Sequence, residues 1–320
     1  MPERVFRAGH LNVGIIDDKI LELKEEIYID PADIAEYAAY IFESGKKRHA
    51  TEELKMALIR EKSNIVMKEI FEGSLEGQNL QAVRELVDDL VKCILIKDAV
   101  LPELLTIKKL DYRVYVHSVN VAVLSLALGK LLGLEEETLR YLGMGAFLHD
   151  IGKRTLPKDI LAGQGRLTNS EYRIYRMHVA EGVEFLESTW KVPAPAVKAV
   201  SQHHEVLSGK GYPRGLRGDS VNLFGRIVGI ANSFDNLITP KLYKHALSPF
   251  EALRVLVAEK GNYDTRILSI FISMLGKGPD KSAGHKASGS SRGHSGPKNS
   301  SNEKALSSPH SREKISIPSC

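Results

Sequence analysis

The chain has 320 residues, 43% of them hydrophobic and 26% charged, which is enough apolar content for one large domain or two ordinary ones. Its two cysteines, Cys93 and Cys320, exclude a disulfide-stapled scaffold, and no run of about 18 apolar residues suggests a membrane span. The formal charge of +4 arises in residues 281–320, which carry a net +5, so the remaining chain offers no basic groove for DNA. We therefore expect a soluble protein of a reducing cytoplasm.

Residues 1–50 predict a small α/β accessory unit. Short apolar runs, broken by a turn at Asp17-Asp18, are typical of strands. A helix then begins at Asp30, with Pro31 in its first turn. Nothing in this unit points to chemistry.

From residue 51 onward, apolar positions recur every three or four residues, which is typical of helices. Residues 51–104 are expected to form a helical connector. Its apolar stripe from Leu80 to Ile94 could be a homodimer seam, but packing onto the neighbouring domain is favoured. From Asp111 to Gly133 the chain is apolar on almost every side, which predicts a central buried helix. Further helices are expected at 135–148, 169–188, 193–205 and 221–237.

The end of the chain, residues 277–320, differs in composition from everything before it. It is rich in Ser, Gly and Lys and contains no Phe, Tyr or Trp. Such a segment buries too little apolar surface to offset the entropy lost on ordering, so we expect it to be disordered.

Five histidines and one aspartate of the helical region predict a metal site. They are His117, His149, Asp150, His178, His203 and His204. A buried imidazole needs a hydrogen-bond partner and a buried carboxylate is costly to desolvate, whereas a divalent ion compensates both. Imidazole and carboxylate ligands without thiolate suit Fe, Mn, Zn, Ni or Co. Because six side chains exceed the needs of one ion with an open position, two ions sharing Asp150 are favoured, a common arrangement for phosphate-ester hydrolysis.

Several segments together resemble the HD-GYP family, a branch of the HD metallophosphohydrolases. The matching segments are HSVNVA at 117–122, HDIGK at 149–153, MHVAEG at 177–182, HHEVLSGKGYP at 203–213 and GRIVGIANSFDNL at 225–237. The resemblance covers residues 105–276 and implies a mainly α fold, an HD-type all-helical bundle, here preceded by the small α/β domain. It also implies hydrolysis of the bacterial second messenger cyclic di-GMP by a hydroxide held between two divalent ions, iron most often and manganese next.

Motif positions carry the family's residue roles onto this chain. One metal would be served by His117, His149, Asp150 and Asn232, and the other by Asp150, His178, His203 and His204. Lys153 would contact the scissile phosphate or metal-bound water and, with Asp150, make up the catalytic pair. The substrate site would further include Tyr212, Lys241, Lys244 and Asp235, the last of which could instead replace or orient a ligand.

Four positions depart from the family pattern. Asn232 stands where a metal-bridging Asp is usual, Ser208 where an Asp precedes the GYP loop, and Lys241 where an Arg is usual. Arg113 stands where members with three metals carry a Glu, which argues against a third metal. An amide oxygen is neutral and a weaker ligand than a carboxylate, so the metal at His117 is expected to be held less tightly.

These departures leave two alternatives to full phosphodiesterase activity open. The chain could be a catalytically weak or inactive signalling module that binds metal and cyclic di-GMP and acts on partner proteins through the GYP loop or the N-terminal unit. It could also hydrolyse a different phosphate ester, because a fold does not determine a substrate.

Overall fold

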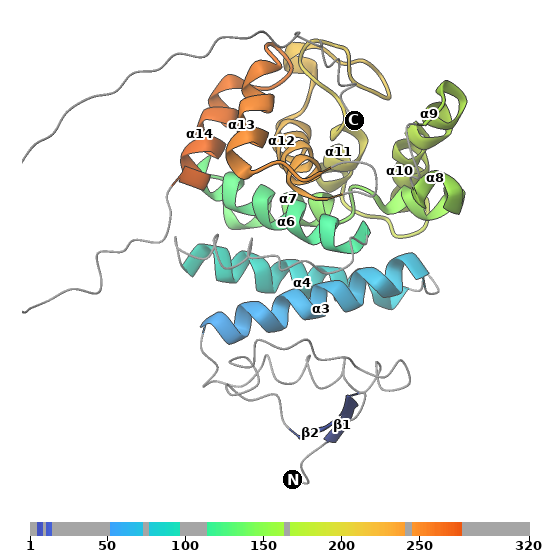
Figure 1. Ribbon diagram of the computed structural model, residues 1–320, viewed down its shortest axis with the longest axis vertical. Helices are drawn as coiled ribbons and strands as arrows, with labels where there is room; N and C mark the ends of the chain where they lie inside the picture. Colours follow the sequence, from blue (N-terminus) through green and yellow to red (C-terminus); the bar gives the residue numbers. More distant parts are fainter. Residues whose placement is uncertain are drawn as a thin grey trace, which may run out of the picture. The chain divides into compact units, whose positions relative to one another are not determined.

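The computed structural model describes residues 5–8, 11–14, 52–72, 77–96, 114–162, 167–240 and 245–276 (Figure 1). The first described element is a hairpin, in which β1 (Val5–Ala8) pairs antiparallel with β2 (Leu11–Gly14). The predicted α/β unit is described only in this hairpin. Its predicted turn and helix, like the segment 277–320, lie outside the described residues.

All the longer described elements are helices, which confirms the mainly α fold. They are α3 (Glu52–Glu72), α4 (Gly77–Ile96), α6 (Val114–Leu131), α7 (Glu136–Phe147), η2 (Ile151–Thr155), α8 (Lys158–Ala162), α9 (Asn169–Arg176), α10 (His178–Ser188), α11 (Ala194–Gln202), η3 (Gly218–Ser220), α12 (Leu223–Ile238), α13 (Pro249–Ala258) and α14 (Thr265–Gly276). Within these ranges, no helix is both long and apolar enough to cross a membrane.

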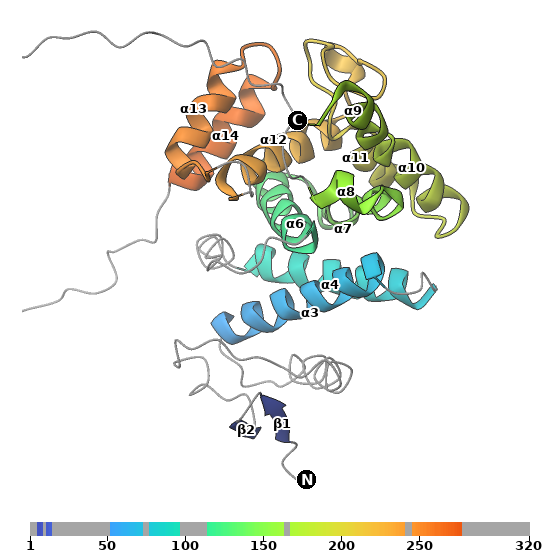
Figure 2. The same ribbon diagram turned by 45° about the vertical axis from the view of Figure 1, so that its right-hand side comes forward.

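Helix α6 lies at the centre of the helical core, as its all-round apolar sequence predicted. Every side chain from His117 to Ala127 is buried. The helix packs against α7 and α12 along its length and also contacts α3, α4 and α14. Figure 2 shows α6 between α4 and α12. A helix in this position can present polar side chains only to the interior, which is where His117 is found.

Helices α3 and α4 belong to the same apolar core. The α4 stripe is buried at Leu80, Val83, Val87, Leu90 and Ile94. It packs against α7, α3 and α6, so the prediction that this stripe covers neighbouring helices is confirmed. The predicted boundary between a connector and a catalytic domain near residue 104 therefore falls between helices that share one core.

Two details of the helix prediction are wrong. The helix expected over 169–188 is interrupted at Met177, whose amide donates to the Ile174 carbonyl and tightens the last turn of α9. Helices α13 and α14 were not predicted at all. The beginning of α13 nevertheless carries a local signal, because Ser248 and Glu251 form a reciprocal cap around Pro249.

We expect Leu90→Ala to lower the free energy of unfolding by about 2–5 kcal/mol, because it leaves a cavity between helices that cannot close fully. Leu90 is 1% exposed within the shared core. Urea denaturation would measure the change, with the exposed neighbour Lys92→Ala as the matched control. Equal stability of the two variants would contradict the shared core.

Candidate metal centre

The fold brings the six predicted ligands together, five of them from helix ends and His117 from within α6. His149 and Asp150 follow α7, His178 begins α10, and His203 and His204 follow α11. The side chains form two groups that share one carboxylate: His117, His149 and Asp150 in one group, and Asp150, His178, His203 and His204 in the other. Within each group, one candidate ligand atom per residue lies within 4.8 Å of all the others.

The Asp150 carboxylate, 1% exposed, faces both groups with different oxygens. Its Oδ2 is 3.3 Å from His149 Nε2 and 3.7 Å from His117 Nε2. Its Oδ1 is 3.4 Å from His178 Nε2 and 3.7 Å from His203 Nε2. This is the arrangement that a carboxylate bridging two ions would require.

Three of the imidazoles are oriented by the same local contact. Nδ1 lies 2.8 Å from the Ala146 carbonyl in His149, 2.6 Å from the Tyr175 carbonyl in His178, and 2.8 Å from the Val200 carbonyl in His203. A carbonyl oxygen can only accept, so each Nδ1 carries the proton and each Nε2 keeps its lone pair. The lone pairs therefore point toward Asp150, as metal ligands would.

His117 is oriented differently, by a buried acid from a distant helix. Its Nδ1 lies 2.7 Å from Oδ2 of Asp235 on α12, and Asn120 donates to the other oxygen of this carboxylate at 2.8 Å. Asp235 and Asn120 are both buried. A carboxylate behind an imidazole fixes its tautomer and ring plane and makes it a better ligand. Sequence reasoning missed Asn120, although it lies one helical turn after His117 on the same face.

Burial keeps the cluster in the protonation states that metal ligands need. It lowers the pKa of His178 to about 3 and of His203 to about 4, and it also lowers the pKa of His117 and His204. Burial raises the pKa of the Asp150 carboxyl, but His149 and Lys153 lower it more, so its pKa lies well below the ordinary value. The cluster thus combines an ionised Asp150 with imidazoles at His117, His178, His203 and His204 whose lowered pKa values keep them neutral.

The donor set fits divalent ions. Among the described residues, His149 Nε2, His204 Nε2 and Asp150 Oδ1 have no hydrogen-bond partner, although all three atoms are buried. Unsatisfied buried acceptors are rare in folded proteins, and several that converge on one region call for a bound cation. The two groups have enough ligands for one ion each, with Asp150 between them.

Lys153 and Tyr212 both contact residues of the cluster. Lys153 donates to Asp150 Oδ2 and lies over the Tyr175 ring. The Tyr212 ring stacks on His204, with centroids 4.4 Å apart and planes 21° apart. Tyr212 also donates its amide to the His204 carbonyl, so loop and ligand are joined by backbone as well as by rings.

The loop that carries Tyr212 is held by Glu205, which sequence reasoning also missed. Its buried carboxylate accepts from the amides of Arg214 and Leu216, at 2.7 and 2.9 Å. Gly211 is needed in this loop because a Cβ there would lie 2.5 Å from the His204 carbonyl oxygen. The sequence could have pointed to Glu205, because this acid directly follows the histidine pair His203-His204.

The remaining predicted site residues have different outcomes. Asn232 is buried on α12, but its side-chain oxygen accepts from Asn236 at 2.7 Å. Both carboxylate oxygens of Asp235 are engaged by His117 and Asn120, which suits an orienting role. Lys241 and Lys244 lie outside the described residues.

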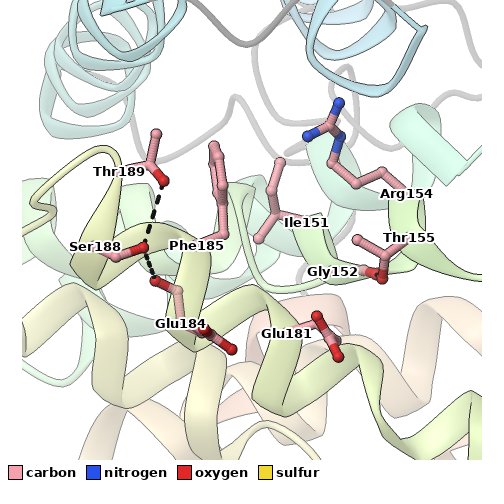
Figure 3. A pocket seen from close by; sticks show the side chains of 9 residues that line it. All are labelled: Ile151, Gly152, Arg154, Thr155, Glu181, Glu184, Phe185, Ser188 and Thr189. Atoms are coloured by element: carbon pink, nitrogen blue, oxygen red, sulfur yellow. Dashed lines mark hydrogen bonds between the residues drawn. The ribbon is translucent and has the colours of Figure 1, made fainter.

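A cavity of about 260 Å³ lies beside η2 and α10 (Figure 3). Ile151, Arg154 and Phe185 line it, together with the carboxylates of Glu181 and Glu184. No candidate ligand lines this cavity, so it is separate from the metal centre.

The chain is similar to known proteins. A model of the HD domain family matches residues 100–267. A cyclic di-GMP phosphodiesterase of Pseudomonas aeruginosa is 28% identical over 86% of this chain and 67% of its own length. The 3'3'-cGAMP-specific phosphodiesterase 1 of Vibrio cholerae is 33% identical over 49% of this chain and 36% of its own length. The chain thus spans about two thirds of one relative and about a third of the other.

The fold has a solved counterpart. An HDG"Y"P protein from Bdellovibrio bacteriovorus matches with a TM-score of 0.66 and 19% identity, over 85% of this chain and 94% of that one. At this identity the match shows a common fold.

We expect the metal-free protein to lose stability as the pH falls from 6.5 towards 4. The unfolded chain protonates its imidazoles near pH 6.5, whereas the folded protein protonates His203 only at about 4 and His178 at about 3. The unfolded state therefore binds more protons in this window, so the free energy of unfolding decreases on acidification. Urea denaturation of chelator-treated protein at several pH values would measure this, and His178→Asn with His203→Asn should flatten the profile. An equally steep profile in that variant would contradict the assignment.

Proposed function

Because the chain belongs to the HD domain family, in its HD-GYP branch, we propose that it is a metal-dependent phosphodiesterase that hydrolyses cyclic di-GMP. The observation that carries this proposal is that the two oxygens of one buried carboxylate, Asp150, face two different groups of imidazoles. Two adjacent divalent ions are a recurrent solution for cleaving phosphate diesters, and this donor geometry suits them.

In this proposal, His117, His149 and Asp150 hold one ion, and Asp150, His178, His203 and His204 hold the other. Iron is the expected metal, with manganese next. When bound, the ions would activate a water molecule and neutralise charge on the phosphate. Asp235 and the carbonyls behind the other rings would keep the imidazoles oriented and deprotonated at Nε2.

Lys153 is the cation best placed to act on the substrate. It is part-buried, and its ammonium lies on the Asp150 carboxylate, within reach of a phosphate bound at the cluster. A fixed positive charge there would stabilise the negative charge that develops on the phosphate oxygens in the transition state. Tyr212, stacked on His204, would cover the same site from the loop side.

The choice of substrate rests on the relatives. The relative from Pseudomonas aeruginosa acts on cyclic di-GMP and the one from Vibrio cholerae on 3'3'-cGAMP, and both compounds are cyclic dinucleotides. A substrate panel of these two compounds, with product chromatography, would separate them. Signalling partners that contact the GYP loop or the N-terminal unit, and a cytoplasmic location, belong to the same proposal.

The second candidate function is a module that binds metal and cyclic di-GMP but cleaves weakly. The contact between Asn232 and Asn236 favours it, because the amide oxygen is already engaged and is a poorer ligand than a carboxylate. The ion at His117 and His149 would then have fewer protein ligands than its neighbour. Binding without cleavage would be the expected behaviour.

We expect metal-loaded protein, prepared without oxygen, to convert cyclic di-GMP to the linear dinucleotide or GMP. His149→Ala should abolish this conversion, because it removes a proposed metal ligand. The imidazole is fully buried, so water from solvent cannot easily take its place. Chromatography of the products and the metal content of both proteins would test it. Fully loaded wild-type protein that forms no product would refute the enzymatic proposal.

We expect Asn232→Asp to raise the metal content toward two ions per chain and to increase turnover. The added carboxylate supplies a charged ligand beside His117, as the family pattern does. Asn236→Ala is the matched control, since it releases the Asn232 oxygen without adding charge. If wild-type protein binds cyclic di-GMP without cleaving it and Asn232→Asp restores cleavage, the second candidate function is correct.

A further inference from the structure

Arg176, the last residue of α9, lies beside the metal centre although no motif includes it. Its guanidinium carbon is 4.6 Å from the centre of the Tyr212 ring and 5.9 Å from that of Tyr172. The two tyrosines meet edge to face, with centroids 6.2 Å apart. Helix α9 packs against α10 at the edge of the helical core (Figure 1).

The position of Tyr212 ties Arg176 to the candidate ligands. The Tyr212 ring stacks on His204 and approaches His178 to 6.4 Å between centroids. One aromatic ring therefore separates the guanidinium from a candidate metal ligand. The guanidinium therefore lies at the periphery of the cluster, whereas Lys153 contacts the Asp150 carboxylate at its centre.

Arg176 is half-buried, yet among the described residues its N–H groups have no carboxylate or carbonyl acceptor. The two rings hold its plane by cation–π contacts, which leave the N–H edge available. A guanidinium prepared in this way is suited to a bidentate bond with a phosphate.

A second cation, Lys153 of η2, lies against the same helix, α9. Tyr175, one helical turn after Tyr172, carries the Lys153 ammonium 5.3 Å from its ring centre. Lys153 also contacts Asp150, whereas Arg176 lies toward Tyr212. The two tyrosines thus hold two cations at separate places around the cluster.

We propose that Arg176 binds the phosphate of a cyclic dinucleotide that is not being cleaved, while the metal centre and Lys153 take the phosphate that is. This inference rests on the proposed function and specifies its substrate class, a ligand with two phosphate diesters. A substrate with one diester cannot use the second cation. Arg176 therefore selects cyclic dinucleotides over simple phosphate diesters.

The test compares cyclic di-GMP with bis(p-nitrophenyl) phosphate, which has a single phosphate. We expect Arg176→Ala to raise KM for cyclic di-GMP by about ten- to a hundredfold, the worth of a charge-assisted hydrogen bond. Its kcat, its metal content and its hydrolysis of bis(p-nitrophenyl) phosphate should stay close to wild type. Arg173→Ala, an exposed arginine on the same helix, is the matched control and should leave both substrates unaffected.

A purely structural role for Arg176 predicts a different result. If Arg176 only supports the GYP loop, Arg176→Ala should impair both substrates equally and lower the melting temperature, and this outcome would overturn the inference. Arg176→Lys keeps the charge but loses the bidentate geometry, so it should recover part of the KM loss. An unchanged KM in Arg176→Ala would overturn the inference and leave the phosphodiesterase proposal intact.

Failure of the proposed function has a separate signature. If wild-type protein binds cyclic di-GMP but cleaves neither substrate, the enzymatic proposal fails, and Kd from titration calorimetry replaces KM as the readout for Arg176. A ten- to a hundredfold weaker Kd in Arg176→Ala would then still support the inference. Wild-type protein that neither binds nor cleaves cyclic di-GMP would overturn both.

Discussion

The centre of this protein depends on one buried ionised carboxylate. Asp150 is 1% exposed, and removing such a charge from water costs several kcal/mol unless nearby groups compensate. The Lys153 ammonium offsets part of this desolvation cost. Divalent ions bound between the two Asp150 oxygens and the surrounding imidazoles would offset the rest. The backbone next to Asp150 lets the turn after α7 pack closely against the start of α10. A Cβ at Gly152 would lie 1.9 Å from the His178 carbonyl oxygen, so only glycine lets the turn after Asp150 reach the start of α10.

Helix ends are the means by which the ligands are aimed. His149 and His203 each follow a helix and turn back to a carbonyl of its last turn, and His178 does the same to the last turn of α9. The last carbonyls of a helix lack the amide that would follow in a longer helix, and here the imidazole Nδ1 approaches them while its Nε2 is directed inward. The same contact therefore stabilises the helix end and selects the tautomer that binds a metal. His117 lies within α6, where such carbonyls are engaged, and it takes Asp235 instead.

The α12 side of the cluster carries an amide pair. There Asn236 donates to the side-chain oxygen of Asn232, at the position where the HD-GYP resemblance implies a metal-bridging Asp. The α9 side, by contrast, is rich in cations and aromatic rings, with Arg176 and Lys153 each held on a tyrosine. Under the proposals made above, the α12 side would affect metal affinity and the α9 side substrate recognition, so the two could change independently of each other.

The sequence by itself determined the helical class, the central position of α6, and which six polar side chains cluster in the interior, because helix periodicity and motif spacing are local properties. It could not determine the role of Asp235, since the contact with His117 joins residues that are 118 positions apart. Nor could it show that Asn236 engages Asn232, although both lie in the segment 225–237, or that Arg176, which lies outside the matching segments, reaches Tyr212. Those outcomes depend on how α6, α9, α12 and the GYP loop pack together. Packing decides which polar atoms meet in the interior, and that was visible only in the tertiary structure.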